Sequence, residues 1–147
     1  MEAKFKDTLR VIGAVRIFKN GELVVEDNNM VVNSGKELVA KLITGQGEVI
    51  SQVRVGDNGT APSLFDDDLL GKLLGSTYVA HRGGLIPAGS PMSIEFDANF
   101  PVGMGLGAVR ECGLFNDLNE MLARKAFPEI NIGIDDSIAF FWTITIK

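Results

Sequence analysis

Short segments in which apolar and polar residues alternate recur along this chain, and they constrain its fold more than any other feature. The clearest is residues 138–146, IAFFWTITI, where Phe140, Trp142 and Ile144 share one face. Alternation with a period of two is typical of a β-strand that is buried on one side. Counting the similar segments predicts about eight strands. The other seven strands are expected near residues 11–17, 23–32, 52–55, 76–83, 93–100, 108–115 and 121–127.

One segment, residues 33–45, has the spacing of a helix instead. We expect the helix to begin at Asn33 or Ser34, because Ser34 and Glu37 match a capping box, and to end at Gly45. Its apolar face is formed by Leu38, Val39, Leu42 and Ile43.

A single helix among many strands lacks the alternation of strands and helices that a parallel sheet requires. The sequence therefore predicts an all-β, mainly antiparallel fold, a jelly-roll-like β-sandwich with one short α-helix. We expect a single domain over residues 1–147, with an extended N-terminal arm at 1–9. Phe140, Trp142 and Ile144 are expected to meet the helix at Leu38 and Leu42, inside the core.

Asn20-Gly21 predicts a hairpin between the first two strands. This pair supplies the two positive-φ positions of a type I′ turn. Residues 26–29, EDNN, suggest a bulge or bend before Met30, and residues 116–120, NDLNE, indicate another hairpin.

Composition excludes several classes of protein. The chain has 147 residues and a formal net charge of −5, which disfavours binding to a phosphate backbone. No apolar stretch approaches the roughly 18 residues of a membrane span, and the first ten residues carry charges where a signal peptide would be apolar. A lone cysteine, Cys112, rules out a disulfide within the chain. We expect no nucleic-acid or membrane partner and synthesis in a cytoplasm.

Gly103, Gly105 and Ala108 match the G-x-G-x-x-A pattern of a dinucleotide-binding turn. That pattern requires a strand before it and a helix after it, whereas the residues that follow here predict a strand. We therefore interpret the segment as a glycine-rich connection between two strands.

Candidate chemical groups are few. His81 is the only histidine and Cys112 the only thiol, and no spacing brings them together. Asp66, Asp67 and Asp68, with Asp57 and Asn58 nearby, are the best candidates for a cation, but three adjacent carboxylates cannot all face one ion. We predict no catalytic residue, no cofactor site and no metal site, and leave open whether the Asp cluster binds a cation.

Glu111 and Arg124 are predicted to be structural. Glu111 shares a strand face with Gly113 and Phe115, so its carboxylate would be buried and would need a partner. Arg124 on the next strand could supply that partner, as could backbone amides. With Trp142 and Phe140, these two residues form the predicted set of structural anchors.

The order of several short motifs resembles that of small virion proteins of tailed bacteriophages. The motifs are an N-x-x-x-N-x-G helix start, a G-x-G/N-G-T-x-P loop followed by acidic residues and leucine, an E-x-G-L-F strand and a terminal W-x-I strand. They extend from about residue 20 to the end of the chain and are short and rich in turn residues. The matching residues are Asn29, Asn33, Gly35, Gly56, Gly59, Pro62, Glu111, Gly113, Leu114, Phe115, Arg124 and Trp142.

The resemblance implies a non-enzymatic structural component of the virion. The favoured interpretation is a capsid decoration, or cement, protein that stabilises the assembled head, similar to the small β-sandwich or jelly-roll cement proteins. A tail, neck or baseplate component is the alternative, and another phage binding module or an enzyme (a hydrolase or metal-dependent lyase) is less favoured. Expected partners are the major capsid protein or another virion protein, together with further copies of this chain.

Partner contacts are expected in glycine-rich loops, where backbones can approach closely. We assign them to the loops at 83–92 and 101–107 and to the arm at 1–9. The candidate residues are Gly83, Gly84, Pro87, Gly103, Gly105 and Gly107.

Overall fold

The structure is a computed structural model that describes residues 10–83 and 92–147. These residues form eight strands and one helix, and most of the strands follow the segments expected from the alternation. In chain order the elements are β1 (Val11–Lys19), β2 (Glu22–Val31), α1 (Asn33–Ile43), β3 (Ile50–Gly56), β4 (Leu73–Gly83), β5 (Met92–Phe100), β6 (Gly107–Asn116), β7 (Met121–Ile132) and β8 (Ile138–Ile146).

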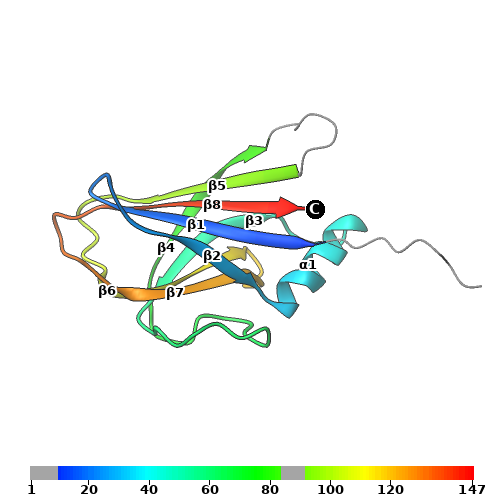
Figure 1. The fold of residues 1–147 in the computed structure, drawn as a ribbon, viewed down its shortest axis with the longest axis horizontal. Coiled ribbons are helices and arrows are strands. Elements are labelled where there is room, and N and C mark those ends of the chain that lie inside the picture. Colours follow the sequence, from blue (N-terminus) through cyan, green and yellow to red (C-terminus); the bar gives the residue numbers. More distant parts are fainter. Residues whose placement is uncertain (1–9, 84–91) are drawn as a thin grey trace, which may run out of the picture.

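The strands close into an antiparallel barrel in the order β1-β2-β7-β6-β3-β4-β5-β8 (Figure 1). Strands β3, β4 and β5 are consecutive, and β6 returns to pair with the far side of β3, which is a Greek-key arrangement. The expected all-β class with one short helix is confirmed. A β-sandwich or jelly-roll is not confirmed, because the alternation of a strand identifies its buried face but not its neighbours.

Two strands of this barrel change partners along their length. The first part of β4 pairs with β3, and residues 79–83 pair with β5. β2 pairs with β1 as far as Asn29 and then with β7 through Met30 and Val31. The ladder is regular across residues 26–29, where a bulge or bend was expected. The register shift lies nearer the start of β2, where Val24 is the extra residue opposite Ile17 and Phe18 of β1.

The type I′ turn is confirmed, since Asn20 and Gly21 have φ values of 52° and 81°. The hairpin expected at residues 116–120 is also present and joins β6 to β7. Phe140, Trp142 and Ile144 lie in the core as expected. On the helix, Leu38 is buried in the same core, but Leu42 lies at its exposed edge.

The helix begins at Asn33, but the capping box is wrong. Val32 is the N-cap and makes no side-chain cap, and the Ser34 hydroxyl donates instead to the carbonyl oxygen of Met121 at 3.1 Å. Tertiary contact replaces the local cap because α1 lies directly on β7. A Cβ atom at Gly35 would collide with the Leu122 carbonyl oxygen. Gly45, with φ of 75°, follows the last turn as expected and donates its N–H to the Leu42 carbonyl.

Candidate functional site

A long loop covers the outer face of β6 and β7. It spans residues 57–72 between β3 and β4 and contains turns and bends only. In Figure 1 it is the green segment that extends below β6 and β7. Glu111 on β6 and Arg124 on β7 face this loop rather than the barrel interior. Both side chains are fully buried, and Arg124 Nε donates to Glu111 Oε1 at 3.2 Å.

The Glu111 carboxylate fixes the loop at both of its ends. It accepts hydrogen bonds from the backbone N–H of Asn58 at 2.7 Å, of Leu70 at 2.8 Å and of Gly71 at 2.9 Å. Gly56 makes room for it, since a Cβ there would lie 2.9 Å from the carboxyl carbon. Every oxygen of this buried anion therefore has a donor.

Arg124 fixes the same loop through its carbonyl oxygens. Its two terminal nitrogens donate to the carbonyl of Thr60 at 2.8 Å and of Asn58 at 3.0 Å, and the Asp66 carboxylate lies 3.5 Å away. We call the buried pair and its bonds to the loop the Glu111–Arg124 clasp. Its geometry is a fully satisfied polar network, which fixes a loop in one conformation.

A second small core lies beside the clasp. Val32, Phe115 and Met121 are buried there, and Met30 and Leu69 pack against them. Gly113 is the cross-strand neighbour of Arg124 and lies against this core, because a Cβ at this position would lie 2.7 Å from the Phe115 ring. The loop is thus fixed by apolar as well as polar contacts.

The outer side of the loop is apolar at its tip. The Phe65 side chain is 86% exposed, and the neighbouring Leu64 is also exposed. The backbone of this tip is nevertheless fixed, because Asn33 N–H at the start of α1 donates to the Leu64 carbonyl at 2.8 Å. Exposed apolar residues mark an interaction surface when they form a contiguous patch, and Leu64 and Phe65 are adjacent exposed apolar residues on this loop.

The glycine-rich connection lies at the opposite end of the barrel from α1, between β5 and β6 (Figure 1). Gly103, Gly105 and Gly107 all have positive φ, and no helix follows them, in agreement with a connection between strands. Val102, Met104 and, on the next loop, Ile134 are exposed there, and Gly103 N–H donates to the Ile134 carbonyl at 2.7 Å. Of the other loop residues expected to bind partners, Gly83 ends β4, whereas Gly84 and Pro87 lie outside the described residues.

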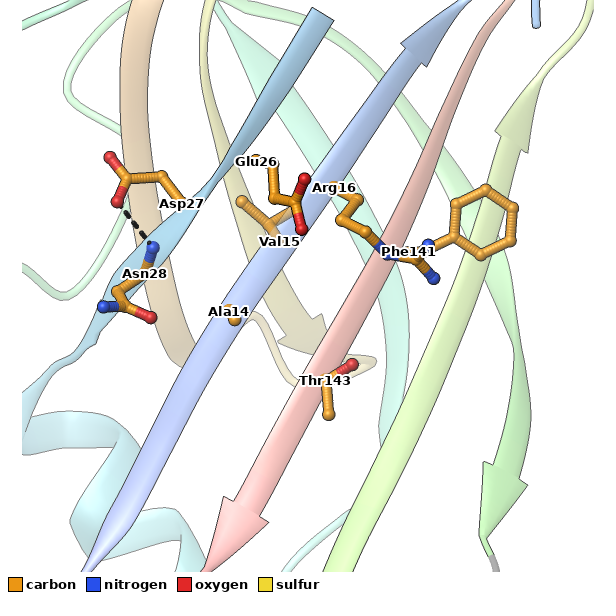
Figure 2. A pocket seen from close by; sticks show the side chains of 8 residues that line it. All are labelled: Ala14, Val15, Arg16, Glu26, Asp27, Asn28, Phe141 and Thr143. Atoms are coloured by element: carbon orange, nitrogen blue, oxygen red, sulfur yellow. Dashed lines mark hydrogen bonds between the residues drawn. The ribbon is translucent and has the colours of Figure 1, made fainter. Parts of the chain in front are cut away.

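A groove of about 530 Å³ lies on the outer face of β2, β1 and β8. Figure 2 shows the side chains that line it. The surface is hollowed here because the cross-strand neighbours Ala14 and Thr143, both with small side chains, form the floor of the groove. The Arg16 guanidinium extends over the Phe141 ring, with 5.4 Å from its carbon to the ring centroid, and its Nη2 lies 3.8 Å from Glu95. These charges have local partners, so the groove gives no indication of a reacting centre.

The candidate chemical groups also have structural partners. Cys112 lies in the core, where burial raises the pKa of its thiol far above the ordinary value. Asp66 accepts from Ser63 N–H, Asp68 from Leu69 N–H and Asp57 from Lys72 N–H. In residues 10–83 and 92–147 no three His, Cys, Asp or Glu side chains are placed to hold a metal ion. For His81 the structure describes the backbone, which pairs with Phe96.

Trp142 has a polar partner that the sequence analysis missed. Its indole N–H donates to Asn29 Oδ1 at 2.7 Å. Asn29 reaches β8 across Gly13 of the intervening strand, where any Cβ would collide with the amide. In the sequence, the one signal for this contact is the glycine at position 13, which leaves space for the Asn29 side chain.

Many of the residues that carry the phage resemblance converge in these contacts. Glu111, Arg124 and Gly56 form the clasp, Gly113 and Phe115 the second core, and Asn29 and Trp142 the polar pair in the barrel. They position loops and strands. The motifs therefore coincide with contacts that hold the loop and the barrel together.

Comparison with protein-family models, curated proteins and solved structures gives no match for this chain. Over the described part of the chain, α1 is too short and too polar to cross a membrane.

Proposed function

We propose that this chain is a structural component of a tailed-phage virion and acts as a capsid decoration protein. The observation that carries the proposal is the loop at residues 57–72, which is held by a buried ion pair and presents Phe65 and Leu64 to solvent. Binding through such a surface depends on complementarity of shape and requires no reactive group.

The partner is the major capsid protein or another virion protein, together with further copies of this chain. The exposed apolar residues at the two ends of the barrel suit protein surfaces, and the net charge of −5 disfavours nucleic acid. We also propose that the chain is similar in fold to the β-sandwich and jelly-roll cement proteins. We expect it to be made in the host cytoplasm and to accumulate in the virion.

Sedimentation with particles that lack the chain tests the proposal. The purified chain should co-sediment with such particles and saturate at many copies per particle. Phe65→Ser should weaken this binding, whereas Tyr78→Ser, which removes another exposed aromatic side chain on β4, should not. A chain that binds no particle would rule out the decoration role.

Copy number separates the alternatives. A tail, neck or baseplate component would bind at a handful of copies per particle, because those structures occur once or a few times in a virion. A hydrolase or metal-dependent lyase would instead show turnover, which Phe65→Ser would leave intact.

A further inference from the structure

An apolar pocket of about 300 Å³ lies where α1 meets the open end of the barrel. Leu42 and Ile43 of the helix form one wall, and Val11, Ile94 and Ile146 from three strands form the other. Ile43 is 77% exposed at its rim. An apolar cavity of about half this volume accepts a benzene ring, so the pocket has room for one aromatic side chain.

The same chain carries an apolar projection of matching size, the Phe65 side chain at the tip of the loop at residues 57–72. It cannot reach the pocket of its own molecule. The tip is bonded to Asn33 at the N-terminus of α1, whereas Leu42 and Ile43 lie at the C-terminal end. Those ends are about 15 Å apart along the helix axis.

Charges beside the two features are complementary. Asp67 and Asp68 follow Phe65 and are exposed. Arg10 and Lys147 flank the pocket-lining Val11 and Ile146, and Lys36 lines an adjoining hollow with Val39 and Ile43. Within the described residues, none of these three cations forms an ion pair.

We propose that Phe65 of one copy inserts into the apolar pocket of a second copy, with Asp67 and Asp68 facing Lys36 and Arg10. The contact joins two different surfaces of the same chain, so it is head-to-tail and produces a closed ring when the rotation closes. This proposal rests on the proposed function in one respect only, because both take the loop at residues 57–72 as a binding surface. Here its partner is a second copy of the chain.

Cross-linking between two variants, each with one introduced cysteine, tests the geometry. Leu64→Cys, next to Phe65, and Thr44→Cys, next to Ile43, are at exposed positions and leave Phe65 and Ile43 in place. The native Cys112 is buried and has a raised pKa, so it should not react. A mixture of the two variants treated with a short bis-maleimide should give a covalent dimer, while each variant alone should stay monomeric on a denaturing gel. A control mixture of Tyr78→Cys with Thr44→Cys should give none. Dimer from Leu64→Cys alone, or none from the mixture, would overturn the proposal.

Charge reversal tests the complementarity in the full chain. By sedimentation velocity the wild type should self-associate, and Phe65→Ser should raise the dissociation constant about tenfold or more. The double variant Asp67→Lys, Asp68→Lys should weaken association, and adding Lys36→Glu should restore part of it. Monomeric wild type at high protein concentration, or no rescue by Lys36→Glu, would contradict the assignment.

These results separate this inference from the proposed function. If the chain is monomeric in solution and yet saturates phage particles, the ring is contradicted and the decoration role is supported. If the chain forms the ring but binds no particle, the ring is supported and the decoration role is contradicted.

Discussion

Glu111 and Arg124 are both buried inside the protein. The Glu111 charge depends on Arg124 and on backbone N–H groups of the loop, and the Arg124 charge depends on Glu111, on Asp66 and on the loop carbonyls. Removing one partner of a buried ion pair leaves the other charge without compensation, which costs far more than the net value of the intact pair. The clasp therefore couples the conformation of the loop at residues 57–72 to the stability of the barrel.

Glu111→Gln is expected to lower the free energy of unfolding by about 3–5 kcal/mol. The substitution removes the carboxylate that pairs with the buried Arg124 charge. It also turns an amide group toward the backbone N–H groups of Asn58 and Leu70, which donate hydrogen bonds to the carboxylate in the wild type. Urea denaturation measures the loss. Glu129→Gln is the matched control, because Glu129 pairs with Arg110 at the surface and should change stability by about 1 kcal/mol or less. An unchanged stability accompanied by loss of a measurable turnover would show that Glu111 has a catalytic role instead.

Trp142→Ala is expected to lower stability by about 3–5 kcal/mol, since the ring is fully buried in the core. The wild-type tryptophan emission maximum should be blue-shifted and should move to the solvent value on unfolding. Phe65→Ala, an exposed aromatic on the loop, should change stability by no more than about 0.5 kcal/mol. A solvent-like emission maximum in the folded protein would place the ring at the surface.

At the residue scale the sequence could predict the contact between Glu111 and Arg124, because the hairpin expected at residues 116–120 makes their two strands neighbours. It could not predict that the loop backbone would supply the remaining donors and acceptors, because those groups are carried by every residue type. The Trp142–Asn29 bond was also out of reach, since it depends on β1 lying between the two strands and on Gly13 within it.

Among the elements, α1 shows how tertiary contact replaces a local preference. In an exposed helix, replacing glycine by alanine is stabilising by up to about 1 kcal/mol. Gly35 instead lies against the β7 backbone at Leu122. The two effects have opposite signs, so one substitution distinguishes them.

Gly35→Ala is expected to destabilise the protein by about 1–3 kcal/mol, because the added methyl group forces α1 away from β7. Thermal or urea unfolding gives the value. Glu37→Ala, an exposed position two residues further along the same helix, should be close to neutral. A stabilising Gly35→Ala would mean that the helix does not pack on β7 as closely as described.

Two turns at the end of the barrel away from α1 are joined by Asp136. The Asn20 side chain and then the Gly133 backbone N–H hold the pKa of this carboxyl below its ordinary value of 3.8. A lowered folded-state pKa stabilises the protein at pH above 3.8, and this contribution is lost as the pH falls through the lower folded-state value. Asp136→Asn, and separately Asn20→Ala, should therefore flatten the decrease of the urea midpoint with acidification. An unchanged slope in both variants would contradict this role.

The elements themselves were largely predictable, because each strand carries its own alternation and the Asn20-Gly21 turn its own chemistry. The helix cap was not, because Ser34 had two candidate partners, the first turn of its own helix and the Met121 carbonyl on β7. The second is 87 residues away along the chain, so local spacing could not reveal it.

For the whole molecule, closure of the barrel depends on β2 and β4, each of which pairs with a different neighbour at its two ends. The alternation of apolar and polar residues shows which face of a strand is buried but not where the strand changes its partner. The sequence therefore led to the expectation of a sandwich. The partner changes also leave the loop at residues 57–72 outside the barrel, over β6 and β7, where its tip is free to meet another molecule.

Quantitative mass spectrometry of purified virions of a phage that encodes this chain tests the central claim most directly. A decoration protein should be present at a copy number that scales with the capsid subunits, and it should be lost together with heads rather than with tails when the two are separated. Presence at a handful of copies in the tail fraction would assign the chain to the tail, and absence from the virion would contradict a structural role.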